Sequence, residues 1–209
     1  VEENIRRQCP YVADVTLKRK LPSKAVIVVT ELPPAMAFPV GKQFVLTTAE
    51  CEYIETTDAL QNATEVYGVG VTPGLAGQRV TFTDSKQEEA FMLLMKELQT
   101  LNITEISKID LTDQGKVRLQ YKNQHIWILG DLTNLNYKLQ FAYQVSQKET
   151  NTGTLDLSAL SGDNKNSYFR SGVLGEFVET VTDTDVVVSE ENNPNDASQV
   201  SEETSQENI

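Results

Sequence analysis

Acid–base and nucleophilic catalysis need a positioned base, and this chain contains a single histidine. His125 lies in an alternating segment, between Gln124 and Ile126 and close to Trp127. No serine or cysteine motif such as Gly-x-Ser-x-Gly accompanies it. A surface or edge position is therefore the favoured interpretation of His125, and an enzyme is not predicted.

Three aspartates offer the next candidate chemistry. Asp110, Asp113 and Asp131 invite comparison with a carboxylate cluster, but each falls at a predicted turn or helix start. Short acidic side chains at such positions accept hydrogen bonds from backbone N–H groups. The capping interpretation is favoured for all three. The segment Gly68-x-Gly70 lacks the third glycine and the strand-to-helix context of a dinucleotide loop.

The two cysteines, Cys9 and Cys51, lack the CxxC or Cys/His spacing of a zinc or redox site. No metal and no cofactor is predicted. In an oxidising compartment the two thiols can pair and join two domains, and the alternative is two independent packing thiols. The spacing alone leaves both alternatives open.

The charge of the chain is uneven. Residues 1–170 hold 18 basic and 20 acidic residues, whereas residues 171–209 hold 10 acidic and no basic residues, so most of the net charge of −12 belongs to this tail. A nearly neutral body offers no basic face for a phosphate backbone, which argues against nucleic acid as a partner. The longest aliphatic run, residues 25–29, is far too short to span a bilayer, and any targeting segment is expected upstream.

The hydrophobic pattern predicts two small domains and a tail, of class α+β. A helix at residues 1–9 ends before Pro10 and precedes a hairpin. Ser85 and Glu88 have the spacing of a capping box at the start of a second helix, and Thr133 is placed to cap a third. The predicted strands cover residues 11–20, 25–31, 36–40, 43–48, 51–56, 105–111, 116–121, 125–129, 154–157 and 168–170.

The apolar stripes of the two later helices are expected to pack on a mixed or antiparallel sheet. They comprise Phe91, Leu94, Leu98 and Leu101 in one helix and Leu135, Leu139, Ala142 and Val145 in the other. The acidic tail has too little apolar surface to repay the entropy of ordering and is expected to be largely disordered.

Two stretches of the chain resemble the FtsQ/DivIB family of bacterial cell-division proteins. The first, in residues 9–35, is similar to the second helix and final hairpin of the family's POTRA domain, although the usual Glu-Arg-x-Pro appears as Glu31-Leu32-Pro33 without the arginine. The second matches the family's β-domain in order and spacing, at residues 109–111, 117–119, 128–131, 135, 138–139 and 153–158.

The resemblance implies a partial POTRA domain over residues 1–35, a β-domain over 36–172 and an acidic tail over 173–209. The family's first POTRA strand and helix have no counterpart here. The resemblance further implies a single-pass protein of the cell membrane, enriched at the division septum, with this part outside the cytoplasm and its membrane helix upstream. It also implies a non-enzymatic scaffold that couples small divisome proteins of the FtsL and FtsB or DivIC type to septal wall synthesis.

A partner-binding surface is predicted at the terminal edge of the β-domain. An open edge presents unpaired N–H and C=O groups to which a partner segment can add as another strand. Tyrosine, phenylalanine and arginine concentrate binding energy in such patches, and the resemblance favours binding over mere capping of the core. Phe169→Glu is expected to abolish partner binding without unfolding. The predicted partner-binding residues are Thr154, Leu155, Leu157, Tyr168, Phe169 and Arg170.

An alternative function is a POTRA-containing docking or chaperone-like module of a protein export or assembly system. Such proteins usually carry several POTRA units ahead of a membrane barrel. Neither a second POTRA unit nor a run of roughly ten-residue amphipathic strands is visible in the sequence.

Overall fold

The computed structural model describes residues 11–20, 24–160, 167–172, 174 and 177. The predicted helix at residues 1–9, Cys9, the turn at 21–23 and nearly all of the predicted tail lie outside these residues. Unit 1 of the fold, residues 1–179, contains every element described below.

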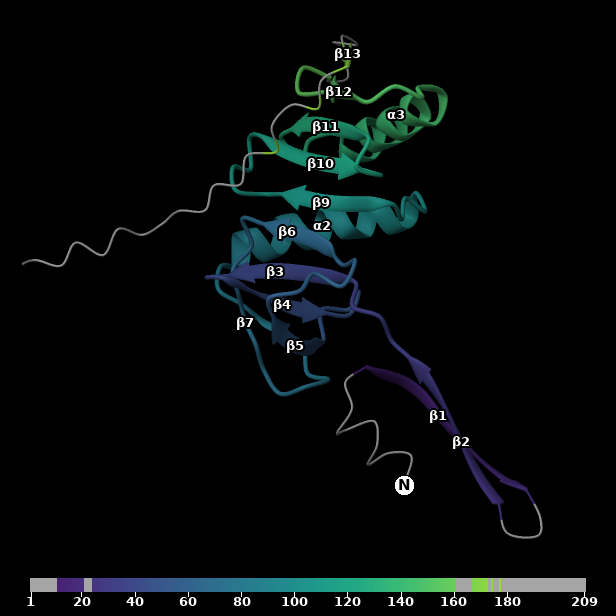
Figure 1. Cartoon of the computed structure of the whole chain (residues 1–209). Coiled ribbons are helices and arrows are strands. Elements are labelled where there is room, and N and C mark those ends of the chain that lie inside the picture. The colour runs from purple at the N-terminus through teal and green to yellow at the C-terminus, as the bar shows by residue number, and fades with distance from the viewer. Residues whose placement is uncertain (1–10, 21–23, 161–166, 173, 175–176, 178–209) are drawn as a thin grey trace, which may run out of the picture. The chain divides into compact units, whose positions relative to one another are not determined.

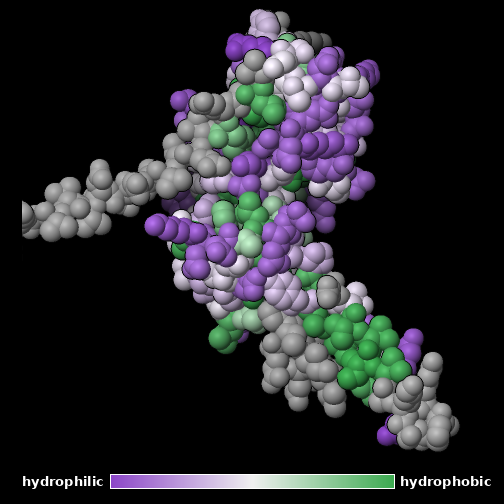
Figure 2. Space-filling model, viewed as in Figure 1, coloured by the Kyte–Doolittle hydropathy of each residue, from purple (hydrophilic) through white to green (hydrophobic). Residues whose placement is uncertain are grey.

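Strands β1 (Val12–Lys20) and β2 (Lys24–Glu31) form a separate antiparallel hairpin, as predicted. The register places Val15 opposite Val29 and Leu17 opposite Ile27. Beyond the hairpin, the Leu32 N–H donates to the Tyr11 carbonyl at 2.6 Å. Figure 2 shows apolar side chains exposed along the hairpin, and those most exposed are Leu17, Ile27, Val28 and Val29. The assignment of this hairpin to a POTRA domain stays a prediction.

The rest of the described chain is built on one nine-stranded sheet in the order β13-β12-β11-β10-β9-β6-β3-β4-β5 (Figure 1). Its strands are β3 (Met36–Val40), β4 (Gln43–Thr47), β5 (Tyr53–Thr57), β6 (Thr64–Tyr67), β9 (Ile106–Asp110), β10 (Val117–Tyr121), β11 (His125–Gly130), β12 (Gly153–Asp156) and β13 (Tyr168–Ser171). A two-stranded ribbon of β7 (Val71–Thr72) and β8 (Thr81–Phe82) lies between β6 and the first described helix in sequence.

The sheet is mixed. Strands β3, β6 and β9 run parallel to one another, as do β11 and β12, and the other neighbours are antiparallel. The meander β9-β10-β11 and the turn at Gly41, where φ is +61°, were both predicted. Strand β6 and the β7-β8 ribbon were not predicted, because each strand is only two to four residues long and Gly68 and Gly70 interrupt the pattern between β6 and β7.

Helix α2 (Ser85–Thr100) begins one residue earlier than its predicted cap implies. The N-cap is Asp84, whose carboxylate accepts from the N–H groups of Lys86 and Gln87 at 2.7 and 3.1 Å. The predicted capping box of Ser85 and Glu88 is therefore wrong. An aspartate caps a helix as effectively as a serine. Here the Asp84 carboxylate, one residue before Ser85, accepts the free N–H groups of the first turn.

Helix α3 (Leu135–Lys148) corrects a second predicted cap. Its N-cap is Asn134, in the left-handed region at φ +52°, and the Asn134 side chain makes no capping hydrogen bond. Thr133 instead donates its hydroxyl to Asp131 at 2.6 Å. Asparagine tolerates this backbone region better than most residues, which explains why the helix can begin there.

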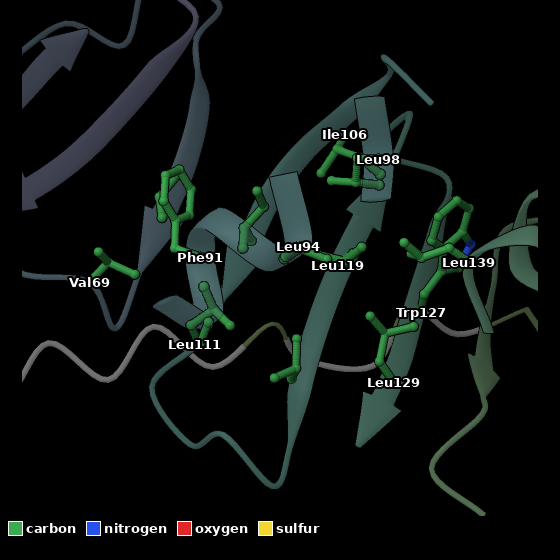
Figure 3. Close-up of a cluster of buried hydrophobic side chains, with 14 of the residues drawn as sticks. Val69, Phe91, Leu94, Leu98, Ile106, Leu111, Leu119, Trp127, Leu129 and Leu139 are labelled. Atoms are coloured by element: carbon green, nitrogen blue, oxygen red, sulfur yellow. The ribbon is translucent and has the colours of Figure 1, made fainter. Parts of the chain in front are cut away.

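Both helices pack on one face of the sheet and enclose the main core (Figure 3). Phe91 of α2 meets Phe38 of β3 edge-on, with ring centroids 5.6 Å apart. Trp127 of β11 is fully buried and donates its indole N–H to Ser146 of α3 at 2.9 Å. Of the predicted stripes, Leu101 and Val145 are only partly buried, and the other members are buried. The predicted class, α+β with a mixed sheet and two packed helices, is confirmed.

The opposite face of the sheet, here called the outer face, is defined by the strand register. Side chains alternate between the faces along each strand, so residues paired across neighbouring strands share a face. The register across β6, β9, β10, β11, β12 and β13 therefore places one row of side chains on the outer face: Tyr67, Asp110, Arg118, Ile128, Asp156 and Tyr168.

Candidate partner-binding edge

The open edge of the sheet is β13, not the predicted strand at residues 154–157. Strand β12 pairs in parallel with β11 on one side and antiparallel with β13 on the other. Three predicted binding residues, Thr154, Leu155 and Leu157, are buried, with 8, 2 and 0% of their surface exposed. The prediction that these residues form the edge is therefore wrong, and β13 takes that position.

The sequence contained a signal for the interior position of β12. Thr154, Leu155 and Leu157 place apolar or β-branched side chains on both faces of the strand. A strand buried on both faces is typical of the inside of a sheet, whereas an edge strand is usually short and polar. Strand β13 has that edge character, with Tyr168 and Arg170 exposed.

The backbone of β13 has a defined outward set of hydrogen-bonding groups. The Gly172 N–H donates to the Thr152 carbonyl at 2.8 Å, in register with the β12-β13 ladder. Residues of an antiparallel ladder alternate between pairs that are hydrogen-bonded to the neighbouring strand and pairs that are not. Tyr168 and Arg170 thus bond inward to β12, whereas the N–H and C=O groups of Phe169 and Ser171 point away from it.

The side chains of β13 divide between the two faces. Tyr168 is 62% exposed, and Arg170 is exposed on the same outer face. Phe169 is half-buried on the helix-bearing face, where its ring meets His125 edge-on at 5.7 Å. A Cβ atom on Gly153 would lie 2.6 Å from the Phe169 ring, so the ring occupies the space that this glycine leaves open.

His125 is a buried residue, which corrects the predicted surface or edge position. It is 1% exposed, and its Nε2 lies 2.9 Å from the carbonyl oxygen of Asn151. The neighbouring Phe169 ring and the Asn151 carbonyl fix the imidazole at the start of β11. Its role in this arrangement is to support the strand pair that carries the edge.

The three candidate aspartates satisfy backbone groups separately, as predicted. Asp110 accepts from the Thr112 N–H at 3.0 Å and pairs with Arg118 at 2.5 Å. Asp113 accepts from the Gly115 N–H at 2.8 Å. Asp131 accepts from the Thr133 N–H at 3.2 Å, at the end of β11. Within the described ranges no group of three or more metal-binding side chains comes together.

One large groove, about 1220 Å³ in volume, lies beside α2. Met92, Met95, Lys96, Ile103 and Glu105 are among the residues that line it, and neither His125 nor Cys51 does. Cys51 is a buried free thiol whose pKa is raised by desolvation, and Cys9 lies outside the described residues. Across the described part of the chain, neither helix has the length and apolar character needed to cross a membrane.

The two ends of the sheet differ in how their backbone is covered. At β5, the Tyr53 N–H donates to the Gln78 carbonyl at 2.7 Å, and the Gly77 N–H donates to the Tyr53 carbonyl at 2.8 Å. Glu52 and Arg79 add an isolated bridge. At β13, no further strand pairs with the outward groups among the described residues. An additional strand is therefore best accommodated at β13.

These features define a mixed α+β sheet protein with an open, aromatic-bearing edge strand. No protein-family model matches the chain. The chain is similar to the cell division protein DivIB of Clostridium tetani (strain Massachusetts / E88), with 29% identity over 157 residues that cover 71% of this chain and 57% of the relative. The match confirms the predicted resemblance to the FtsQ/DivIB family. The chain spans a little over half the length of that relative.

Proposed function

We propose that the chain is the extracytoplasmic part of a cell-division protein that holds other division proteins through the β13 edge and has no catalytic activity of its own. Its partners in this proposal are small membrane proteins of the FtsL and FtsB or DivIC type. An upstream helix would anchor the protein in the cell membrane, with enrichment at the division septum. The similarity to a DivIB protein supports the division role.

The observation that carries the binding site is the outward backbone of β13. Phe169 and Ser171 offer N–H and C=O groups to an added strand, and Tyr168 and Arg170 flank them on the outer face. Main-chain hydrogen bonds supply affinity in strand addition, and alternate side chains supply selectivity. Tyrosine and arginine are enriched among the residues that dominate binding energy. The edge thus combines the two components that recognition of an extended peptide requires.

The test uses the whole chain and the extracytoplasmic segments of the FtsL- and DivIC-type proteins of the same genome, with binding measured by calorimetry. Ser171→Pro removes one outward N–H while leaving the inward bonds of Tyr168 and Arg170 in place. Because the partner's carbonyl would lose its donor, we expect about tenfold weaker binding or more. Ser171→Ala keeps the N–H and is expected to bind like the unmodified chain.

Tyr168→Ala and Arg170→Ala test the side-chain contribution at the same edge. Both residues are exposed, so neither change should disturb the fold. Each is expected to weaken binding without changing the circular dichroism spectrum. Equal binding by Ser171→Pro and Ser171→Ala, with both variants folded, would refute the β13 site. Absence of binding by the unmodified chain would refute the proposed partners.

A further inference from the structure

Phe177 lies far from the β13 edge, against two side chains of the outer face. Its ring centroid is 6.3 Å from that of Tyr67, at an interplanar angle of 59°. The Arg118 guanidinium carbon lies 5.8 Å from the centre of the same ring. Tyr67 ends β6 and Arg118 belongs to β10, so the two sides of this contact come from strands separated by β9.

The Tyr67 and Arg118 side chains are held in place by the sheet itself. The Tyr67 hydroxyl donates to the carboxylate of Glu65, which in turn pairs with Lys108 at 3.2 Å. The Arg118 guanidinium pairs with the buried Asp110 carboxylate at 2.5 Å. A cation placed over an aromatic face and a tilted pair of rings are both attractive geometries. The two side chains therefore form a fixed cradle for an aromatic ring.

The chain leaves the edge strand immediately after β13. Gly172 has φ +95°, a backbone conformation that residues other than glycine rarely adopt. Strand β10 is three positions from β13 in the sheet, which at a strand spacing of about 4.8 Å is roughly 14 Å away. By Phe177, five residues later, the chain is over β10 and β6. The edge and the cradle are thus separate places on the molecule.

We propose that the cradle of Tyr67 and Arg118 is a binding site for Phe177 of the same chain, which ties the start of the C-terminal extension to the outer face of the sheet. The occupant is set by the contact itself, because Phe177 is already seated on both side chains. The consequence is that Phe177 lies over β6 and β10, away from the outward backbone groups of β13. The proposal goes beyond partner binding and does not depend on the partner's identity.

Tryptophan fluorescence tests the proposal on the whole chain without any partner. Trp127, the one tryptophan of the chain, is fully buried, so acrylamide quenches an added indole selectively. Phe177→Trp places an indole in the cradle. Leu75→Trp places one at a residue that is 72% exposed and serves as the matched control. We expect a quenching constant several-fold lower for Phe177→Trp than for Leu75→Trp.

A second substitution in the cradle separates binding from incidental shielding. Adding Tyr67→Ala to Phe177→Trp removes one wall and should raise quenching toward the Leu75→Trp value. Adding Tyr67→Phe keeps the ring and should leave quenching low. Equal quenching of the two single variants would overturn the proposal, as would quenching of Phe177→Trp that Tyr67→Ala does not change. Circular dichroism confirms folding of each variant. Because no partner is present, failure here leaves the β13 proposal intact.

Discussion

Lys138→Met removes a buried ammonium group from the junction between β11 and α3. The Lys138 side chain is 1% exposed, and its Nζ donates to the Leu129 carbonyl at 2.8 Å and to the Asp131 carbonyl and carboxylate at 2.9 Å each. Methionine fills much of the same space but offers no donor. The substitution therefore isolates the contribution of the charged head from that of the apolar stem.

The magnitude follows from what each acceptor loses. Leu129 is fully buried, so its carbonyl loses a charge-assisted bond with no water to replace it, at about 2 kcal/mol. The other two acceptors, the Asp131 carbonyl and carboxylate, belong to a residue whose side chain is 55% exposed, so water can replace the ammonium there and their combined loss is about 1 kcal/mol. Relief of the buried ammonium's desolvation offsets about 1 kcal/mol of this sum. The net expectation is about 2 kcal/mol of lost stability.

Urea unfolding followed by circular dichroism measures this loss. With a urea dependence of about 2 kcal/mol per molar, the unfolding midpoint should fall by about 1 M at unchanged slope. Lys148→Met, an exposed lysine in the last turn of the same helix, is the matched control and should change stability by no more than about 0.5 kcal/mol.

An unchanged or raised midpoint for Lys138→Met would refute this reasoning. It would mean that desolvation of the ammonium equals or exceeds its three hydrogen bonds, as happens when some buried ion pairs are replaced by apolar side chains. A fall of the same size in Lys148→Met would also refute it, because the effect would then not depend on burial.

Two further predictions concern an acid-sensitive carboxylate and a close backbone approach. Hydrogen bonds from Thr133, and then from Lys138, lower the pKa of Asp131 from 3.8 to about 2, so its stabilising contribution is complete above about pH 4 and is lost as the pH falls toward 2. Discounted for the exposure of Asp131, that contribution is about 1 kcal/mol. In Asp131→Asn, the unfolding free energy should therefore fall by about 1 kcal/mol less between pH 4 and pH 2 than in the unmodified chain. Gly68→Ala should destabilise by about 3 kcal/mol or more in urea, because Gly68 has φ +77° and a Cβ there would lie 2.1 Å from the Thr112 nitrogen. Gly41→Ala, at φ +61° with nothing within 4 Å, should cost only about 1 kcal/mol. Equal losses from the two glycine substitutions would contradict the steric explanation.

The regular elements were predictable where the apolar period was long enough to be seen. Helix α2 shows its stripe in Phe91, Leu94 and Leu98. The strands of the meander β9-β10-β11 are five or six residues long, and β10 alternates strictly between apolar and polar residues apart from its terminal tyrosine. The four residues of β6 show no such period, yet β6 joins the two halves of the sheet by pairing with β3 and β9. That pairing is a long-range contact, and no local pattern encodes it.

Buried polar residues are the second feature that the apolar pattern of the sequence does not reveal. Lys138 and Ser146 lie on the apolar face of α3, yet each is buried because β11 supplies a partner from another element. His125 is buried for the same reason, through the Asn151 carbonyl and the Phe169 ring. Sequence reasoning predicts exposure for such residues, because their compensating hydrogen bonds come from distant parts of the chain.

The position of Phe169 changes what its substitution can show. Phe169→Glu was expected to abolish binding in a folded chain, but the ring packs on His125 and over Gly153 and so attaches β13 to the sheet. A carboxylate there would face a half-buried apolar site, and the edge strand itself would be lost together with any partner. Loss of binding by Phe169→Glu would therefore be expected whether Phe169 contacts the partner or only supports β13. Substitutions of Tyr168 and Arg170 distinguish partner contact from support of the strand, because these side chains are exposed on the outer face and their removal leaves the inward hydrogen bonds of β13 intact.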